Sequence, residues 1–367
     1  MSPADLFLRR ESAPIATETH DEEQRSTMIK VGLIGGGGIA SAHIRGYTTH
    51  ADRIAVTAIA DAVPMTVERR AAELGARGFD DYRQMITEAD LDAVDICLPH
   101  HLHRDAIVAA AEAGLHILCE KPLCLSTTEA AEVQQAVARA GVTLMCAHNQ
   151  LFLPAVAEAK ALLDAGRLGR VYEVRTTDCF HNDFDPANMG WRASAATSGG
   201  GELIDTGYHP TYLMLHLAGS VPVEAAAMLS THRLTFAEGE DSAQVIVRFE
   251  NGAVGTLWTS WAYDPPEITE RFSVVAEHGT LHSDGTSLHV RYRSGETAST
   301  TYDAVDTFVA EIGHFADSLI AGGRPLHTEK EGIEALGMIL AGYESARTRT
   351  IAPVLRAAPA ASEGSLA

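Results

Sequence analysis

The chain has little positive charge. Its 28 Lys and Arg residues stand against 49 Asp and Glu residues, which gives a formal net charge of −21 over 367 residues. An acidic surface repels phosphate backbones, so nucleic acid is not an expected partner. No apolar run approaches the ~20 residues that cross a bilayer, and the N-terminus lacks the basic-then-apolar pattern of a secretory signal. We therefore expect a cytoplasmic protein with no membrane partner.

Cysteine is also scarce, and no two cysteines form a Cys-x-x-Cys pair. The five thiols are Cys97, Cys119, Cys124, Cys146 and Cys179. Several lie in or beside apolar runs typical of strands, so we expect buried, reduced thiols. His100, His101 and His103 crowd one loop, but no Cys, Asp or Glu accompanies them at metal-ligand spacing. No metal site is predicted.

What the sequence does contain is an alternation of apolar strands and helical segments from residue 28 to 150. The strand-like runs are IKVGLIG, IAVTAIAD, AVDICLP, HILCEKP and VTLMCAHN. Strand and helix repeated at this spacing predict a parallel sheet with helices on both faces. The polar residues 1–27 have no periodicity, and we expect a disordered or loosely docked extension there.

The pattern changes after residue 151. Longer strands with alternating polar and apolar residues appear, and Asn251-Gly252 is a strong hairpin signal. Helices are expected at 154–165, 306–321 and 328–349. This indicates a second α/β domain over 151–352 with a large open, mainly antiparallel sheet. Residues 353–367 are predicted to be a flexible tail.

Four glycines follow the first predicted strand directly and precede a helix. Gly35, Gly37 and Ala40 fit the pattern G-x-G-x-x-[GA] of a dinucleotide-binding turn. Gly38 and Ile39 open the helix, whose unpaired N–H groups would face a pyrophosphate. Gly36 and Gly38 are extras that the pattern does not require.

An acidic residue follows the glycine turn at the end of the second strand. Asp61 stands 26 positions beyond Gly35, where a carboxylate would bind the ribose hydroxyls of the cofactor. The same charge would repel a 2′-phosphate, and Ala62 and Val63 supply no arginine. The sequence therefore favours NAD over NADP.

Three further stretches carry a family resemblance. They are CLPHHLHRDAIVAAAEAGLHILCEKP, AHNQLFLPAVAEAKALLDAGRLGRVYEV and WRASAATSGGGELIDTGYHPTYLMLHLAG. Together with the glycine turn, the chain resembles the glucose-fructose oxidoreductase, inositol dehydrogenase and rhizopine-catabolism (Gfo/Idh/MocA) family from about residue 30 to 349. The resemblance implies a Rossmann domain, a second domain with an open sheet, NAD as cofactor, and homo-oligomers (dimers or tetramers) formed through that sheet.

The resemblance also implies roles for individual residues. Glu120 would lie by the nicotinamide ribose, and Lys121 between the nicotinamide and the substrate hydroxyl. Further cofactor contacts are implied for Leu98, Pro99, His103 and Asn149. Substrate contacts are implied for Trp191, Arg192, Asp205 and His209, and we place His181 at the rim of the same pocket.

The pair Asp205 and His209 also has a chemical argument of its own. A spacing of four places both on one face of a helix start. Histidine titrates near neutral pH and suits proton removal from an alcohol. Asp205 would orient the imidazole or hold a neighbouring hydroxyl, and Lys121 would stabilise the developing alkoxide.

The chain departs from the family at two places. Tyr212 stands where an aspartate often follows the histidine, and Gln150-Leu151 replaces a frequent Arg-Arg or Arg-Tyr pair. The pocket is therefore expected to differ from those of the common inositol and glucose enzymes.

Three functions are consistent with these residues. The first is an NAD-dependent oxidoreductase that takes hydride from a secondary hydroxyl of a sugar, sugar derivative or cyclitol. The alternative is a redox-neutral, NAD-dependent glycoside hydrolase, for instance on an anionic glycoside such as a sulfoquinovoside, with Arg192 as the cation. That scheme needs a second acid/base, for which the candidates are His181, Asp183, His148 and Tyr208. The third is a regulator without catalysis, against which Lys121, Asp205 and His209 argue.

Overall fold

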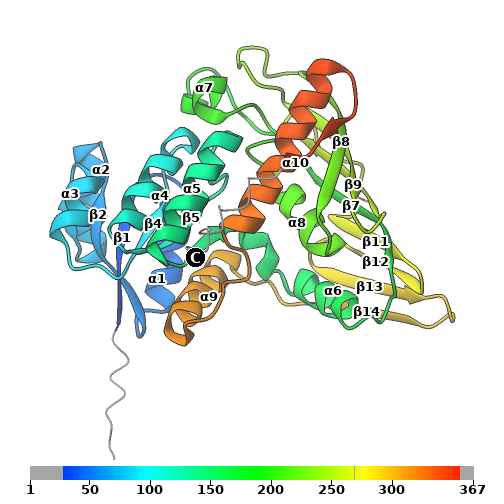
Figure 1. The fold of residues 1–367 in the computed structure, drawn as a ribbon, viewed down its shortest axis with the longest axis horizontal. Helices are drawn as coiled ribbons and strands as arrows, with labels where there is room; N and C mark the ends of the chain where they lie inside the picture. Colours follow the sequence, from blue (N-terminus) through cyan, green and yellow to red (C-terminus); the bar gives the residue numbers. More distant parts are fainter. Residues whose placement is uncertain (1–27, 268, 356–367) are drawn as a thin grey trace, which may run out of the picture.

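The computed structural model describes residues 28–267 and 269–355. Within them the chain forms two sheets that stand side by side, each covered by helices (Figure 1). The predicted fold class, a Rossmann domain followed by an α/β domain with a large open sheet, is confirmed. The extension predicted for residues 1–27 and most of the tail predicted for residues 353–367 lie outside the described residues.

The first sheet is fully parallel, in the order β3-β2-β1-β4-β5-β6. Its strands are apolar along their length because helices cover both faces. The strands are β1 (Ile29–Ile34), β2 (Ile54–Ala60), β3 (Arg77–Phe79), β4 (Ala93–Ile96), β5 (His116–Glu120) and β6 (Leu144–Ala147). The sequence predicts all of them except β3, which is too short and too exposed to leave an apolar pattern.

The helices of the first domain divide between the two faces of this sheet. One face carries α1 (Ala40–Thr49), α2 (Pro64–Leu74) and a later helix, α9 (Thr307–Ala321). The other carries α3 (Tyr82–Glu88), α4 (His103–Glu112) and α5 (Thr127–Ala140). Two short 3₁₀ helices, η1 (His100–Leu102) and η2 (Asn149–Phe152), follow β4 and β6. The chain order reverses between β1 and β4, which is where such sheets bind ligands.

The second sheet has nine strands in the order β14-β13-β12-β11-β7-β10-β9-β8-β15. Only β7 and β10 pair in parallel, so the sheet is mainly antiparallel, and the hairpin predicted at Asn251-Gly252 joins β9 to β10. The strands are β7 (Val171–Cys179), β8 (Pro222–Ser230), β9 (Ser242–Phe249), β10 (Val254–Ser260), β11 (Phe272–Ala276), β12 (Gly279–Ser283), β13 (Ser287–Tyr292), β14 (Thr297–Thr301) and β15 (Ala352–Pro353). Residues 353 and 354 do not belong to the predicted tail, because β15 pairs with β8 and Val354 is buried.

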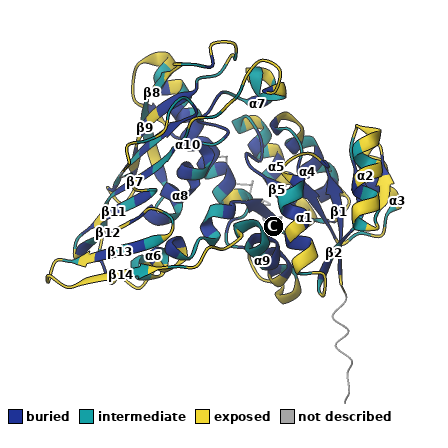
Figure 2. Cartoon of the chain, turned by 180° about the vertical axis from the view of Figure 1, so that it is seen from behind, coloured by how far each residue is buried: buried dark blue, intermediate teal, exposed yellow. Residues whose placement is uncertain are grey.

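Helices cover one face of the second sheet and leave the other open (Figure 2). The helices of this part are α6 (Pro154–Asp164), α7 (Ala195–Ser198), α8 (Tyr208–Ala218) and α10 (Glu329–Thr348), with the 3₁₀ turn η3 (Gly190–Ala193). On the open face Met228 is 83% exposed and Ile246 is 54% exposed. None of the helices in the described ranges is long and apolar enough to cross a membrane.

Helix α9 corrects the predicted domain boundary. From the sequence, residues 306–321 were predicted to belong to the second domain. In the structure, α9 returns to the first domain and packs against α1 (Figure 1). Ile312 and Phe315 are fully buried in the core that β1 and α1 form. A Cβ atom on Gly46 would lie 2.5 Å from the Ile312 side chain, so glycine allows this close approach. The first domain is therefore discontinuous in sequence.

A chain of buried histidines runs between β6, α8 and α10. Nδ1 of His148 lies 2.6 Å from Nδ1 of His327, and Nε2 of His327 lies 3.3 Å from Nδ1 of His216. Burial lowers the pKa of His327 to about 3 and that of His216 to about 4. These rings are therefore neutral in the folded protein at neutral pH.

We expect the α9 contact to be a large part of the stability of the first domain. Ile312→Ala should lower the free energy of unfolding by ~2–5 kcal/mol, because a fully buried aliphatic side chain leaves a cavity. Ile320→Ala, on the same helix but 56% exposed, should change it by less than ~0.5 kcal/mol. Urea denaturation followed by circular dichroism measures both variants, and equal values would contradict this packing.

The buried histidines predict a loss of stability in mild acid. As pH falls below about 6.5 the unfolded chain binds protons on these rings, whereas the folded protein does not until pH 3–4. Each such histidine makes the free energy of unfolding fall by up to ~1.4 kcal/mol per pH unit. His216→Asn should make this pH dependence shallower between pH 6.5 and 5. His101→Asn, whose ring is exposed, should not; urea titrations at several pH values test both.

Candidate active site

The glycine turn after β1 has the geometry of a dinucleotide cradle. Gly35 has φ +95°, and a Cβ atom there would lie 2.5 Å from the carbonyl oxygen of Cys97. A Cβ atom on Gly37 or Gly38 would meet nothing within 4 Å, so these glycines face open space. Gly36 is not a dispensable extra, as the sequence pattern suggested. A Cβ atom at this position would lie 2.6 Å from the Thr66 side chain. Gly36 is therefore required for the packing of α2.

The open space belongs to a cavity of about 590 Å³ at the carboxyl ends of β1, β2, β4 and β5. Residues from both domains line this cavity. They include Gly35, Gly37, Gly38, Ile39, Asp61, Leu98, Pro99, His100, Glu120, Lys121, Trp191, Arg192 and His209. The cavity therefore joins the glycine turn to Lys121 and His209, two of the three predicted catalytic residues. A backbone that leaves room beside two glycines at a helix start fits the pyrophosphate of a dinucleotide.

Asp61 lies at the end of β2 beside this turn. Its carboxylate accepts hydrogen bonds from the backbone N–H groups of Gly36 and Val63, both at 2.8 Å. Arg70 of α2 also reaches the turn, where it donates to the carbonyl oxygens of Gly36 and Gly37. The sequence analysis found no arginine here because Arg70 comes from the next helix. Arg70 also pairs with Glu73.

A buried network fixes Glu120 at the floor of the cavity. His43 lies between two carboxylates, with Nδ1 2.8 Å from Asp95 and Nε2 3.1 Å from Glu120. Carboxylates only accept hydrogen bonds, so both ring nitrogens must donate and the ring is an imidazolium. Although burial opposes it, the charge of Asp95 holds the pKa of His43 well above its usual value. Burial likewise opposes ionisation of Glu120, but His43 lowers the pKa of this carboxyl to about 2.

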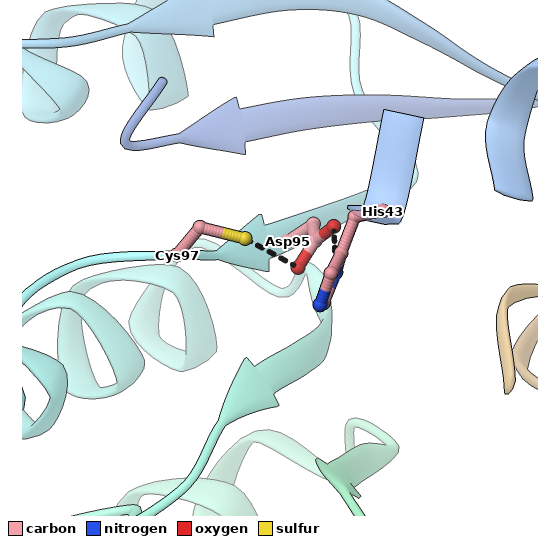
Figure 3. A group of neighbouring side chains, drawn as sticks. All are labelled: His43, Asp95 and Cys97. Atoms are coloured by element: carbon pink, nitrogen blue, oxygen red, sulfur yellow. Dashed lines mark hydrogen bonds and ion pairs between the residues drawn. The ribbon is translucent and has the colours of Figure 1, made fainter. Parts of the chain in front are cut away.

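Figure 3 shows the deeper part of this network, where Cys97 and His43 both point toward Asp95. Their ligand atoms all lie within 4.8 Å of one another, a spacing that could hold a metal ion. However, both nitrogens of His43 already donate to carboxylates, so the group acts as a hydrogen-bonded support for Glu120. Two of the three loop histidines are also engaged by backbone carbonyl groups. Nδ1 of His100 contacts the carbonyl of Ser198 at 2.9 Å, and both ring nitrogens of His103 contact carbonyl oxygens.

Lys121 and Asp205 meet across the two domains. Lys121 Nζ donates to the backbone carbonyl of Asp205 at 2.8 Å and to its carboxylate at 3.2 Å. Arg192 pairs with the other carboxylate oxygen of Asp205 and stacks over Trp191 at 4.3 Å. Burial opposes ionisation, but Lys121 and Arg192 hold the pKa of Asp205 well below its usual range. Asp205 is therefore an anion held between two cations.

His209 is oriented differently from the sequence prediction. Asp205 lies in the turn before α8, and no hydrogen bond joins it to His209; Nδ1 of His209 instead lies 2.9 Å from the hydroxyl of Tyr212. Asp205 thus does not orient this imidazole, and its alternative role toward a substrate hydroxyl stays a prediction. Burial, together with the charge of Lys121, lowers the pKa of His209 to about 3. The ring is neutral at physiological pH.

Besides Asp205 and the buried Ala40, three further predicted contact residues do not line the cavity. His103 is buried, with its nitrogens 2.6 Å and 2.7 Å from the carbonyl oxygens of Pro122 and Leu98, so it holds the cavity wall in place. Asn149 donates to Thr307 at 3.0 Å and lies behind the site. His181 is on an exposed loop beside Asp183. Their predicted contacts with cofactor or substrate stay predictions.

Two of the lining residues that were not predicted from the sequence form walls of the cavity. The His100 ring contacts Trp191 edge-on at 4.4 Å, so the two form one wall of the cavity. Phe308 comes from α9 and closes the cavity from another side. The position of His100 directly after Pro99 was a usable signal. Phe308 had none, because only the tertiary fold brings it here.

Comparisons with known proteins agree with this geometry. Residues 29–148 match the model of an oxidoreductase family with an NAD-binding Rossmann fold, and residues 156–282 match the GFO/IDH/MocA C-terminal domain. Levoglucosan dehydrogenase of Pseudarthrobacter phenanthrenivorans is 31% identical over 62% of this chain and 66% of its own length. The 1,5-anhydro-D-fructose reductase of Ensifer adhaerens is 27% identical over 89% of this chain and 99% of its own length.

Solved structures give the same result. A levoglucosan dehydrogenase in complex with NADH and levoglucosan superposes with a TM-score of 0.82 at 26% identity, covering 89% of this chain and all of the other. The two family matches fall in order on the two domains, and the glycine cradle fits the cofactor of these relatives. The chain belongs to the Gfo/Idh/MocA family and is an NAD-binding oxidoreductase.

Proposed function

We propose that the protein oxidises a secondary hydroxyl of a sugar, sugar derivative or cyclitol, with Lys121, Asp205 and His209 as the catalytic residues. The observation that carries this proposal is that one cavity is lined by the glycine turn, Lys121 and His209. Bound NAD supplies the hydride acceptor. The chain must then position the alcohol, stabilise charge on its oxygen and accept its proton.

Lys121 stabilises the charge on that oxygen. Its ammonium group is fixed by Asp205 and is only slightly exposed, so its field acts in a site with little water. Asp205 keeps this ammonium in place and offers carboxylate oxygens to a neighbouring hydroxyl of the substrate. A polyol fits this arrangement, because adjacent hydroxyls would meet a donor and an acceptor together.

His209 accepts the proton. The hydride and its electron pair leave the carbinol carbon for the nicotinamide, the hydroxyl proton goes to the imidazole, and a carbonyl remains. The neutral form of His209 at physiological pH keeps a ring nitrogen free for this transfer. The proton then has to pass to solvent or to a neighbouring group before the next turnover.

The relatives support a carbohydrate or cyclitol substrate. Their names include levoglucosan, 1,5-anhydro-D-fructose and inositol, all of which are neutral polyols or their derivatives. The aromatic wall of His100 and Trp191 suits the flat face of a sugar ring. Arg192, suggested as the cation for an anionic sugar, is already paired with Asp205. A neutral substrate is therefore favoured.

Redox-neutral glycoside hydrolysis has less support. None of its four candidate acid/base residues lines the cavity: His148 and Tyr208 are buried, and His181 and Asp183 lie on an exposed loop.

The cytoplasmic location predicted from the sequence stays a prediction.

A substrate panel tests the proposal. Purified protein is incubated with NAD and a set of free sugars, cyclitols, anhydrosugars and neutral or anionic glycosides, while NADH absorbance and released sugars are both followed. Stoichiometric NADH with an oxidised product supports the dehydrogenase. Sugar release without NADH would replace it with the hydrolase, and neither signal from any member of the panel would overturn the proposal.

Substitutions at the site should separate catalysis from cofactor binding. Lys121→Met and His209→Asn are each expected to lower kcat about 10²- to 10⁴-fold, because they remove the charge stabiliser or the base. Affinity for NAD, measured by calorimetry, should change little. His101→Asn is the control, since this exposed histidine lies outside the cavity. Normal turnover in either site variant would contradict the assignment.

We also propose a homo-oligomer formed through the open face of the second sheet. Met228 and Ile246 expose apolar side chains there, and such faces are commonly covered by a partner. Ile246→Asp should shift the protein toward a smaller species in light scattering after size exclusion. Met65→Asp, on α2 and 80% exposed, is the matched control. A monomeric wild-type protein would contradict the proposal.

A further inference from the structure

The hydroxyl of Tyr212 is the meeting point of three polar groups at the domain junction. It lies 2.9 Å from Nδ1 of His209, 3.1 Å from the backbone nitrogen of Gln150 and 3.4 Å from Oδ1 of Asn149. The tyrosine is fully buried, and its ring stacks on His148 at 4.1 Å. The phenol is therefore held in one place from several sides.

The fixed donor and acceptor beside the phenol favour one direction for its hydrogen bonds. The N–H of Gln150 can only donate, and the Asn149 carbonyl oxygen can only accept. A phenol oxygen accepts two hydrogen bonds and donates one. If its proton goes to Asn149, its remaining lone pair accepts from Nδ1–H of His209. In the opposite arrangement, with the phenol donating to Nδ1, the Asn149 oxygen would lose this partner.

We infer that Tyr212 is the positioning residue of the catalytic base: it accepts the Nδ1 proton of His209 and so leaves Nε2 free to take the proton of the substrate. This deepens the proposed function, because it rests on His209 as the base. It also explains the departure of the sequence at position 212, where a phenol replaces the frequent aspartate. In hydrolytic triads a carboxylate sets the tautomer of the histidine in the same way.

A phenol does only half of what a carboxylate does. It selects the tautomer, but as a neutral group it does not stabilise an imidazolium by charge. The basic groups around His209, Lys121 and Arg271, oppose protonation further, whereas Glu120 and Asp205 favour it. The imidazolium form of His209 is therefore disfavoured, so the ring readily releases the proton that it has accepted.

The same hydroxyl ties the base to the domain junction. Asn149 donates to Thr307 at 3.0 Å, so a continuous path runs from the start of α9 through η2 to α8. Gln150 in turn accepts from Arg271 of the second sheet at 2.7 Å. Tyr212 therefore locks the imidazole to elements of both domains.

The tautomer can be observed directly and without a substrate. Long-range ¹H–¹⁵N spectra of the full-length, histidine-labelled protein, recorded with and without NAD, report which ring nitrogen carries the proton. His209→Asn identifies the His209 signals by their disappearance. We expect the proton on Nδ1. A proton on Nε2 would overturn the inference, whatever the substrate panel shows.

Two variants and one control complete the test. Tyr212→Phe should abolish the preference for Nδ1–H, because its acceptor is gone. Asn149→Ala should release the phenol proton toward Nδ1 and shift His209 to the Nε2–H form, which covers the case in which Tyr212→Phe fails to fold. Tyr208→Phe is the control: it removes an equally buried hydroxyl from the same helix, bonded to the carbonyl of Gly332. An unchanged tautomer in both variants would refute the role of Tyr212.

A kinetic readout follows once the panel has identified an oxidised sugar. Tyr212→Phe should lower kcat about 10- to 100-fold, less than the loss of the base itself, and leave KM within about twofold. Tyr208→Phe should keep both parameters near wild type. A loss confined to thermal stability, with kcat unchanged, would reduce Tyr212 to a structural residue. An inactive wild type would overturn the proposed function, but the spectra would still decide the tautomer.

Discussion

The ion pair between Lys121 and Asp205 is the contact on which the site depends, because each residue comes from a different domain. Lys121 directly follows strand β5 of the Rossmann sheet, and Asp205 lies in the turn before α8. Neither domain alone could place an ammonium group beside both a nicotinamide site and a substrate site. Arg192 pairs with the second oxygen of Asp205, so each oxygen of the buried carboxylate faces a cation. Breaking one partner would leave a buried charge without its counter-ion, which is strongly unfavourable.

The Rossmann domain contains a second buried charged group, in which opposite charges are again in contact. His43 carries a positive charge between Asp95 and Glu120, so the floor of the cavity has two anions sharing one cation. Glu311 of α9 is fully buried nearby, and burial raises the pKa of this carboxyl well above its usual value. A neutral Glu311 avoids a third negative charge in this region. The Rossmann domain thus presents a fixed electrostatic environment to the cofactor.

Features fixed by residues close together in sequence could be predicted, whereas features fixed by contacts between distant residues could not. The glycine turn, Asp61 and Lys121 lie where they were predicted, since a strand, a turn and a helix next to one another in sequence fix their positions. The position of α9 could not be predicted, because its apolar face would fit either domain and only the packing of Ile312 on Gly46 decides. Asp205 was predicted to orient His209 or to hold a substrate hydroxyl, and its contact with Lys121 could not be predicted for the same reason. Spacing placed it near His209, but Lys121, 84 residues away in sequence, competes for it.

The return of α9 has a mechanical consequence. The chain passes between the domains along residues 148–153, again along 302–306, and a third time along 322–328. A two-domain protein with one linker can swing open about a single hinge, whereas here three connections would have to bend in concert. Thr328 also forms a β-bridge with Met145, which fastens the third passage to the edge of the Rossmann sheet. Any change in the distance between the two halves of the cleft therefore has to be absorbed at all three connections at once.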